Sequence, residues 1–243
     1  MVMLQVIKAD EHYKGQHDWL TTYHHFSFGE YYNPEKMSFG PLRVFNDDIV
    51  EPGTGFDFHP HNNMEIVTYL IDGELEHKDN YGNHGIIKPG EVQRMSAGIG
   101  IIHAEYNHSK EKPLRLLQMW ILANKKNLKP SWEQHKFTKE QQLNKLLPVV
   151  VPENSENGDA LKIHQDTAFY LSTITPQNTI QHTINNERMV YIFVINGETK
   201  INGKLLQTRD AVMVENEKMV SITAQKQTEL ILIDLPQKFL VNQ

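Results

Sequence analysis

Short apolar runs separated by turn-forming residues make up most of the hydrophobic pattern of this chain. Asp72-Gly73 and Asn196-Gly197 predict two-residue hairpin turns, in which glycine tolerates positive φ. Lys88-Pro89-Gly90-Glu91 suits a type II turn. Regular short strands joined by such turns indicate an all-β sandwich or barrel. The predicted strands cover residues 42–45, 65–71, 74–77, 91–96, 102–106 and 114–122, and then 169–175, 179–184, 190–195, 199–201, 211–214, 220–223 and 229–235.

A polar stretch that contains three prolines interrupts the strand pattern in the middle of the chain. Within it, Thr138-Lys139-Glu140-Gln141 resembles a capping box and predicts a short helix that runs through Leu147. A weak internal repeat aligns Ile71-Asp72-Gly73-Glu74 with Ile195-Asn196-Gly197-Glu198 and indicates two copies of one β-unit. We therefore expect domains at 1–125 and 161–243, joined by a linker at 126–160 that contains the helix.

Composition and charge narrow the classes of function. The formal net charge is -6, with 24 Lys and Arg against 30 Asp and Glu, which argues against direct nucleic-acid binding. The chain has no cysteine, so disulfides, thiolate metal sites and thiol nucleophiles are excluded. The first residues do not resemble a signal peptide. No apolar stretch of the sequence approaches the roughly 20 residues that a membrane helix needs. These features predict a cytoplasmic protein without a membrane partner.

Two pairs of metal-ligating residues carry the candidate chemistry. His59 and His61 flank Pro60, and His103 and Glu105 follow a glycine-rich segment. Side chains at i and i+2 of a strand point to the same face, so each pair can reach one ion. Three imidazoles and one carboxylate suit Fe(II), Mn, Co, Ni, Cu or Zn better than Mg or Ca.

The competing interpretation is that these histidines are ordinary packing or surface residues. With 13 His in the chain, one His-x-His motif is weak evidence. Two such pairs are harder to explain by packing, because inward-facing imidazoles and a carboxylate are costly to bury without partners. Glu65 lies near the motif and is expected to support the site rather than to bind the ion. The other histidines considered, which we expect to be surface or structural, are His77, His84, His108, His135, His164 and His182.

The motifs around these pairs resemble those of the cupin superfamily and, more specifically, of the pirin family. Gly53-x5-His59-x-His61-x3-Glu65-x7-Gly73 resembles the first cupin motif, and the segment from Gly85 to His103 resembles the second. The pirin-like segments are Phe39-Gly40-Pro41-Leu42-Arg43-Val44, Pro52-Gly53-Thr54-Gly55-Phe56, His59-Pro60-His61, Met64-Glu65-Ile66-Val67, Arg94-Met95-Ser96-Ala97-Gly98 and Gln118-Met119-Trp120-Ile121.

This resemblance implies a bicupin, that is, two β-barrel (double-stranded β-helix or jelly-roll) domains with a short helical linker. It further implies a monomer that binds one iron through His59, His61, His103 and Glu105 of the N-terminal domain. Aligning the repeat leaves none of the four ligand residues in place, so the C-terminal cupin is expected to be metal-free. His182 is expected to point to the opposite face from Thr183. The residues aligned with the four ligands are Thr183, Asn185, Ile222 and Ala224, and Met189 is aligned with Glu65.

Bacterial pirin-like proteins resemble enzymes that open the flavonol quercetin with O2 and release carbon monoxide, a quercetin 2,3-dioxygenase activity. On this hypothesis the metal acts as Lewis acid and template, and Glu105 accepts the proton of the flavonol hydroxyl. A flat aromatic substrate fits the aromatic residues near the motifs, although Tyr69 and Trp120 lie in predicted strands and are expected in the core. Those residues are Phe56, Phe58, Tyr69 and Trp120.

Two other functions remain open at this stage. Eukaryotic pirins resemble iron- or redox-responsive transcriptional co-regulators, which bind a protein partner and need no turnover. A cupin with vestigial metal binding is less compatible with the sequence, since all four ligands are present in one domain and all are lost in the other.

Overall fold

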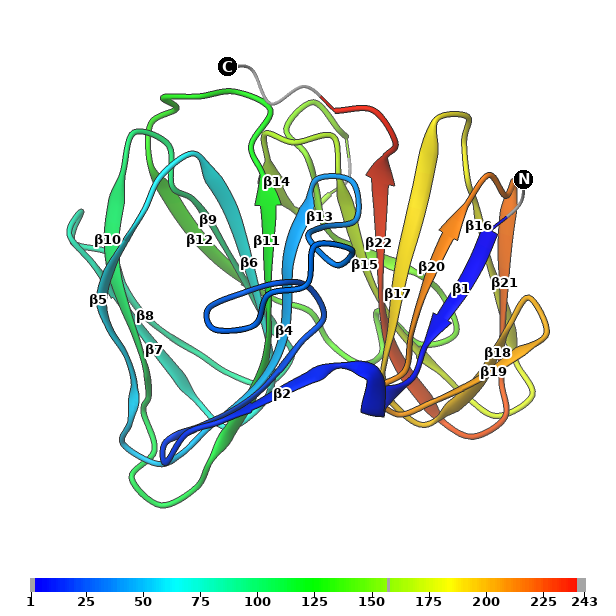
Figure 1. The fold of residues 1–243 in the computed structure, drawn as a ribbon, viewed down its shortest axis with the longest axis horizontal. Coiled ribbons are helices and arrows are strands. Elements are labelled where there is room, and N and C mark those ends of the chain that lie inside the picture. The colour runs from blue at the N-terminus through cyan, green and yellow to red at the C-terminus, as the bar shows by residue number, and fades with distance from the viewer. Residues whose placement is uncertain (1–2, 157, 240–243) are drawn as a thin grey trace. The chain divides into compact units, whose positions relative to one another are not determined.

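The computed structural model describes residues 3–156 and 158–239 (Figure 1). The contacts between Cα atoms divide the chain into two units, which we call the first and the second unit. The first unit comprises Tyr13–Lys136 and Leu161–Gln165. The second comprises residues 3–12, 137–160 and 166–239. Among the described residues, no helix is long and apolar enough to cross a membrane.

The first unit contains two antiparallel sheets. A seven-stranded sheet has the order β12-β9-β6-β11-β4-β3-β2, and a four-stranded sheet has the order β5-β10-β7-β8. The strands are β2 (Tyr13–Gln16), β3 (Leu20–His24), β4 (Leu42–Val50), β5 (Gly55–His61), β6 (Met64–Asp72), β7 (Leu75–Asp79), β8 (His84–Ile87), β9 (Glu91–Ser96), β10 (Ile101–Asn107), β11 (Leu114–Leu122) and β12 (Ser131–Lys136), with β14 (Leu161–Ile163) from later in the chain.

The second unit repeats this architecture. Its large sheet has the order β1-β20-β17-β22-β15-β13, and its four-stranded sheet has the order β16-β21-β18-β19. The elements are β1 (Met3–Ile7), the short 3-10 helix η1 (Ala9–Glu11), β13 (Leu147–Pro152), β15 (Ala168–Ile174), β16 (Thr179–Thr183), β17 (Arg188–Asn196), β18 (Glu198–Ile201), β19 (Lys204–Gln207), β20 (Ala211–Glu215), β21 (Met219–Ala224) and β22 (Thr228–Pro236).

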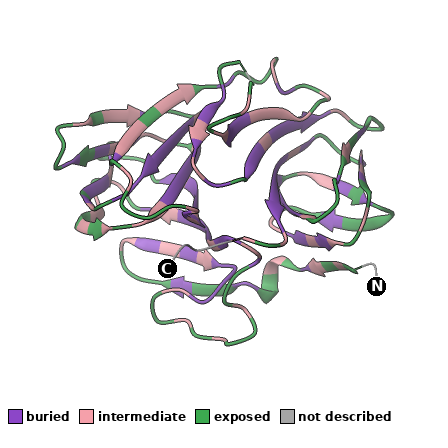
Figure 2. Cartoon of the chain, turned by 90° about the horizontal axis from the view of Figure 1, so that it is seen from above, coloured by how far each residue is buried: buried purple, intermediate pink, exposed green. Residues whose placement is uncertain are grey.

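In each unit, the core lies between the two sheets. Buried residues, purple in Figure 2, lie mainly along the strands. In the first unit, Leu70 from the large sheet packs in one cluster with Leu75 and Ile87 from the small sheet. Each fully buried aliphatic side chain of this kind contributes about 1.5–3 kcal/mol. The predicted all-β bicupin fold is confirmed, and each unit is a jelly roll of two separate sheets rather than a closed barrel.

The predicted turns form where the sequence placed them. Gly73 and Gly197 have φ of 85° and 103°, and Gly90 has φ of 83°. The backbone N–H of Glu91 donates to the carbonyl of Lys88 at 2.9 Å, closing the turn between β8 and β9.

The predicted helix at 138–147 does not form. Thr138 and Gln141 do exchange the two hydrogen bonds of a capping box, at 2.8 and 3.3 Å. The chain then turns at Asn144, whose φ is 52°, and its N–H donates to the carbonyl of Thr173 at 2.8 Å. The backbone groups that a helix would have used are therefore bonded to β15 instead.

The division of the chain differs from the expected boundaries at 125 and 160. β12 pairs with β9 in the first unit, whereas β13 pairs with β15 in the second. β1 pairs with β20, so the chain begins its described part in the second unit. The stretch expected to be a linker consequently supplies strands to both units.

Gly98 holds the turn that leads into β10, and we expect its replacement by alanine to destabilise the protein. Its φ is 49°, and an added Cβ would lie 1.9 Å from the carbonyl oxygen of Leu128. Left-handed backbone and steric overlap together should lower the free energy of unfolding by roughly 3 kcal/mol. Gly53 is the matched control, because its φ is 65° and nothing lies within 4 Å of an added Cβ. Urea titration of both variants measures the two losses of unfolding free energy. Gly53→Ala should lose only about 1 kcal/mol, and a loss equal to that of Gly98→Ala would contradict this account.

Candidate metal centre

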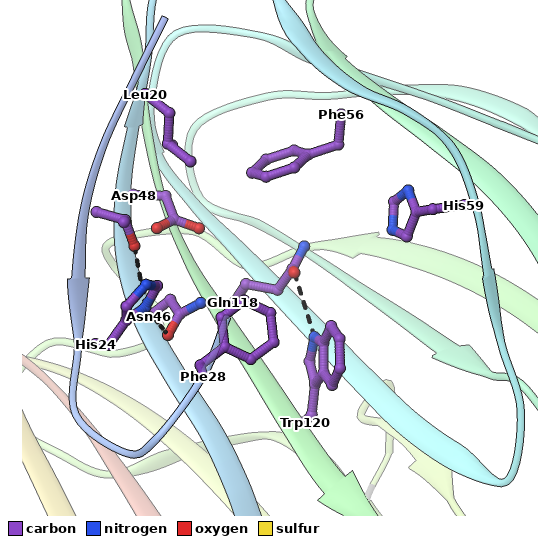
Figure 3. Close-up of a pocket in the computed structure, with 10 residues that line it drawn as sticks. Leu20, His24, Phe28, Asn46, Asp48, Phe56, His59, Gln118 and Trp120 are labelled. Carbon is purple, nitrogen blue, oxygen red and sulfur yellow. Dashed lines mark hydrogen bonds between the residues drawn. The ribbon is translucent and has the colours of Figure 1, made fainter. Parts of the chain in front are cut away.

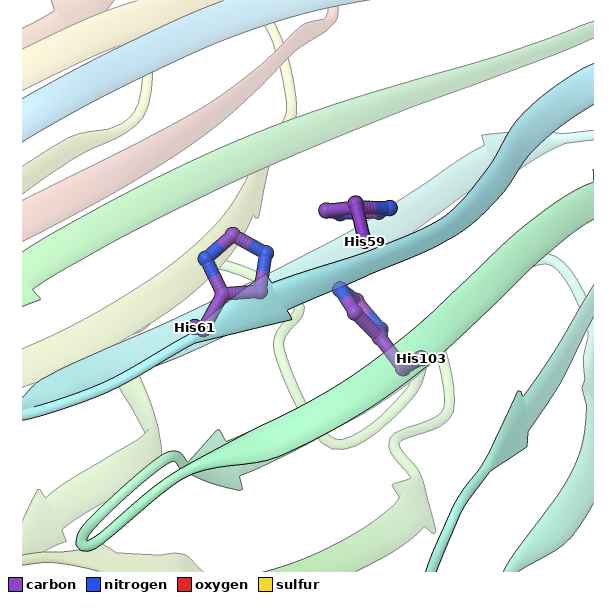
Figure 4. A group of neighbouring side chains, drawn as sticks. All are labelled: His59, His61 and His103. Carbon is purple, nitrogen blue, oxygen red and sulfur yellow. The ribbon is translucent and has the colours of Figure 1, made fainter.

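Three histidines converge at the pairing of β5 and β10. In the antiparallel register, His103 lies opposite His59 and Ile101 lies opposite His61. One ring nitrogen from each of His59, His61 and His103 lies within 4.8 Å of the others. The rings project from the two strands toward a common space (Figure 4), with centroids 4.4 to 4.9 Å apart. The alternation that the sequence predicted is therefore present for these three residues.

Glu105 is placed differently from the histidines. The register of β10 against β5 shifts between His103 and Glu105, and Glu105 falls into a second group, with His77 and His103, whose ligand atoms lie within 4.8 Å. Its buried carboxylate accepts a hydrogen bond at Oε2 from Gln118 Nε2, at 2.7 Å. Trp120 Nε1 donates to Gln118 Oε1 at 3.2 Å. This second bond orients the Gln118 amide so that its NH2 group faces Glu105.

Two buried atoms at this site have no hydrogen-bond partner in the protein. They are His103 Nε2 and Glu105 Oε1, both on residues that are 1% exposed. A buried polar atom without a partner costs about 1–3 kcal/mol. A divalent metal ion would satisfy a nitrogen and a carboxylate oxygen together, so these residues fit such an ion.

The protonation of the histidines also suits a metal. Burial, together with the neighbouring histidines, lowers the pKa of His61 and of His103 to about 3. Both rings are therefore neutral at ordinary pH, as a metal ligand must be.

A backbone hydrogen bond fixes the tautomer of His59 and leaves one ring nitrogen free to bind a metal. Its Nδ1 lies 2.7 Å from the backbone carbonyl oxygen of Asp57. A carbonyl oxygen can only accept, so Nδ1 carries the hydrogen and Nε2 keeps its lone pair.

A cavity of about 170 Å³ adjoins the centre (Figure 3). Phe28, Phe56 and Trp120 give it apolar walls, and the ring of Trp120 meets the ring of His61 edge-on at 4.7 Å. Burial raises the pKa of Asp48 to about 7, and its Oδ1 has no hydrogen-bond partner. The remaining lining residues are Leu20, Thr22, His24, Asn46, His59 and Gln118, of which the first three also line a neighbouring cavity of about 260 Å³.

The aromatic residues considered from sequence have three different positions. Phe56 and Trp120 line the cavity, whereas Tyr69 is buried in the core and Phe58 is 61% exposed. Trp120 was expected in the core because it lies in a strand; it faces the cavity because β11 runs alongside the centre.

The second unit has no comparable centre, since both groups of ligands found among the described residues lie in the first unit. Ile222 and Ala224 are fully buried apolar residues. His182 points to the opposite face from Thr183, as expected, and it is His182 that faces inward. It shares the inner face of β16 with Ile180, and its Nε2 lies 2.6 Å from Asp234 Oδ2, while Thr183 is exposed.

Sequence reasoning missed His77 and Asp79, which lie directly behind the centre on β7. His77 was expected to be a surface or structural residue, and it is completely buried against His103. The signal was present as His77-x-Asp79, a third i,i+2 pair. Glu65 lies elsewhere, accepting hydrogen bonds from Ser96 Oγ and the backbone N–H of His164 at 2.5 and 3.3 Å.

Comparison with known proteins gives a consistent result over both units. Residues 6–121 match the family described as Pirin, and residues 149–235 match the quercetinase C-terminal cupin domain. Quercetin 2,3-dioxygenase of Escherichia coli is 40% identical over 234 residues, covering 96% of this chain and 99% of that protein. A pirin-like protein of Caulobacter vibrioides is 40% identical over 218 residues, covering 90% of this chain and 93% of that protein. The crystal structure of the bacterial pirin YhhW from Escherichia coli in complex with nickel(II) has a TM-score of 0.92 at 39% identity, covering 97% of this chain and 100% of that one.

Proposed function

This chain belongs to the pirin family, and from that premise we propose that it is a metal-dependent dioxygenase that opens a flavonol such as quercetin with O2. The observation that carries the proposal is the pair of buried, unpartnered ligand atoms on His103 and Glu105 beside an apolar cavity. The names of the relatives support the same reaction.

We assign His59, His61, His103 and Glu105 as the ligands of one divalent metal. Three nitrogens and one carboxylate oxygen fit Fe(II), which we propose as the working ion, and also Mn, Co, Ni, Cu or Zn. The nickel(II) complex of the related pirin supports a divalent transition metal as the ion. When bound, the ion supplies Lewis acidity that lowers the pKa of a substrate hydroxyl.

The side chains of this unit have defined tasks in the proposed reaction. Phe28, Phe56 and Trp120 can hold a flat ring system between them, because all three line the cavity. Glu105 would accept the proton of the substrate hydroxyl at Oε1 when that oxygen is released from the ion, since Gln118 already occupies Oε2. Asp48 is available to accept a hydrogen bond from a further hydroxyl, because its Oδ1 has no partner in the protein.

The direct test is anaerobic reconstitution with Fe(II), followed by an aerobic assay with quercetin. We expect loss of the flavonol absorbance and release of carbon monoxide, both dependent on the metal. The metal-free protein is the control and should leave quercetin intact. Tight iron binding without turnover would contradict the dioxygenase and favour an iron-responsive interaction protein instead.

A further inference from the structure

His77 and Asp79 lie on β7, which pairs with the side of β10 that faces away from β5. In the antiparallel register, Asp79 is opposite His103 and His77 is opposite Glu105. The side chains of His77 and Asp79 are completely buried. Trp132 stacks on the His77 ring with centroids 5.3 Å apart. Their positions are thus fixed by packing as well as by hydrogen bonds.

Asp79 accepts four hydrogen bonds. Its Oδ1 accepts from the backbone N–H groups of Tyr81 and Asn83, at 2.9 and 3.0 Å. Its Oδ2 accepts from Asn83 Nδ2 at 2.8 Å and faces His77 Nε2 at 3.3 Å. Burial raises the pKa of Asp79, but the bonds from Asn83, His77 and Tyr81 outweigh it and hold the pKa below its usual value. Asp79 is therefore an ionised acceptor, and His77 Nε2 must be the donor.

The same reasoning extends from His77 to His103. With Nε2 turned to Asp79, the His77 ring presents its Nδ1 to His103. That atom lies 3.4 Å from His103 Nδ1. A hydrogen on His103 Nε2 would be buried without an acceptor, whereas His103 Nδ1 faces His77, so the hydrogen of His103 belongs on Nδ1 and the lone pair on Nε2. His103 Nε2 is the buried, unpartnered atom of the metal centre.

We propose that Asp79 and His77 are positioning residues that fix the tautomer of His103, so that its Nε2 lone pair faces the metal. We call Asp79, His77 and His103 the tautomer relay. This proposal rests on the metal centre proposed above. The relay does for His103 what the backbone carbonyl of Asp57 does for His59, whose tautomer it fixes directly. In the relay the same result needs two side chains, because His103 Nδ1 faces a histidine rather than a carbonyl oxygen.

Asp79→Asn tests the relay because the surroundings determine how the new amide is oriented. Two backbone N–H groups, of Tyr81 and Asn83, would hold the amide oxygen. The NH2 group would then face His77 Nε2 as a donor, and Asn83 can turn its own amide to accept from it. His77 would move its hydrogen to Nδ1, and His103 would move its hydrogen to Nε2, where it blocks the metal.

The first measurement is the nitrogen-15 NMR spectrum of the histidine rings in the metal-free full chain, which distinguishes the two tautomers. We expect His103 as the Nδ1–H form in the wild type and as the Nε2–H form in Asp79→Asn. The second is nickel(II) affinity by calorimetry, where Asp79→Asn should lose about 10- to 100-fold. Asp72→Asn is the matched control, since the Asp72 side chain accepts a hydrogen bond from the backbone N–H of Gly73 in its own exposed turn; it should change neither readout.

The outcomes separate the relay from the metal centre. An Nε2–H tautomer of His103 in the metal-free wild type would overturn the relay, and so would an unchanged tautomer in a folded Asp79→Asn. A switched tautomer with unchanged nickel affinity would overturn its positioning role. A wild type that binds no nickel, but has the expected tautomers, would instead refute the metal centre. The chemical-shift dispersion of the same spectrum reports whether Asp79→Asn is folded. If this variant does not fold, the tautomer of His103 in the wild type still tests the relay.

Discussion

Replacing His61 with alanine is expected to lower the affinity for divalent metal by more than about 100-fold and to abolish quercetin turnover. Loss of a residue that only supports a ligand already costs 10- to 100-fold, so loss of a ligand should cost more. His61 provides one of the three ring nitrogens that lie within 4.8 Å of one another. Its low pKa, about 3, means that the wild-type protein needs no deprotonation of this ring at neutral pH.

The metal content and affinity of His61→Ala are best measured with nickel(II) or anaerobic Fe(II), alongside the quercetin assay. His84→Ala is the matched control. His84 is an exposed histidine of the same unit, and its Nε2 lies 2.9 Å from Glu76 Oε1, on the outer surface of the small sheet. This control should keep one metal per chain and full turnover. Wild-type affinity in His61→Ala would remove His61 from the ligand set.

The strands and the histidine pairs could be predicted because both depend on local alternation. Side chains two residues apart on a strand share a face, and this alone brings His59 beside His61. The turns were equally local, since Gly73 and Gly197 adopt the positive φ that their sequences require. The resemblance to pirins added what alternation does not contain, namely that the two pairs belong to one metal site.

The sequence did not predict the features that depend on tertiary contacts. The capping hydrogen bonds of Thr138 and Gln141 form as expected, but the backbone that follows is hydrogen-bonded to β15 and does not continue as a helix. The repeat alignment placed Thr183 opposite the ligand His59, yet Thr183 is exposed and His182 faces inward, because an error of one residue in register exchanges the two faces of a strand. Asp79 and His77 were missed because their role arises from the pairing of β7 with β10.

Glu105→Gln is expected to preserve the fold and to lower turnover by about 100- to 10,000-fold at saturating Fe(II), which is the usual contribution of a general base. Glutamine has nearly the same shape as glutamate, so the buried site should remain packed. Gln118 presents its NH2 group to this position, and Trp120 holds it in that orientation. The new amide oxygen should therefore accept from Gln118, and its NH2 group should face the metal side.

That orientation removes both functions proposed for Glu105 Oε1. An NH2 group can neither accept the proton of a substrate hydroxyl nor donate a lone pair to an ion. Bound iron must be measured together with turnover, so that the rate is expressed per iron and the loss of a ligand is separated from the loss of a base. Iron retained with a rate per iron at the wild-type level would refute the base role, because the proton would then have another acceptor. Asp48 is the next candidate in that case, since it lines the same cavity and has an unpartnered oxygen.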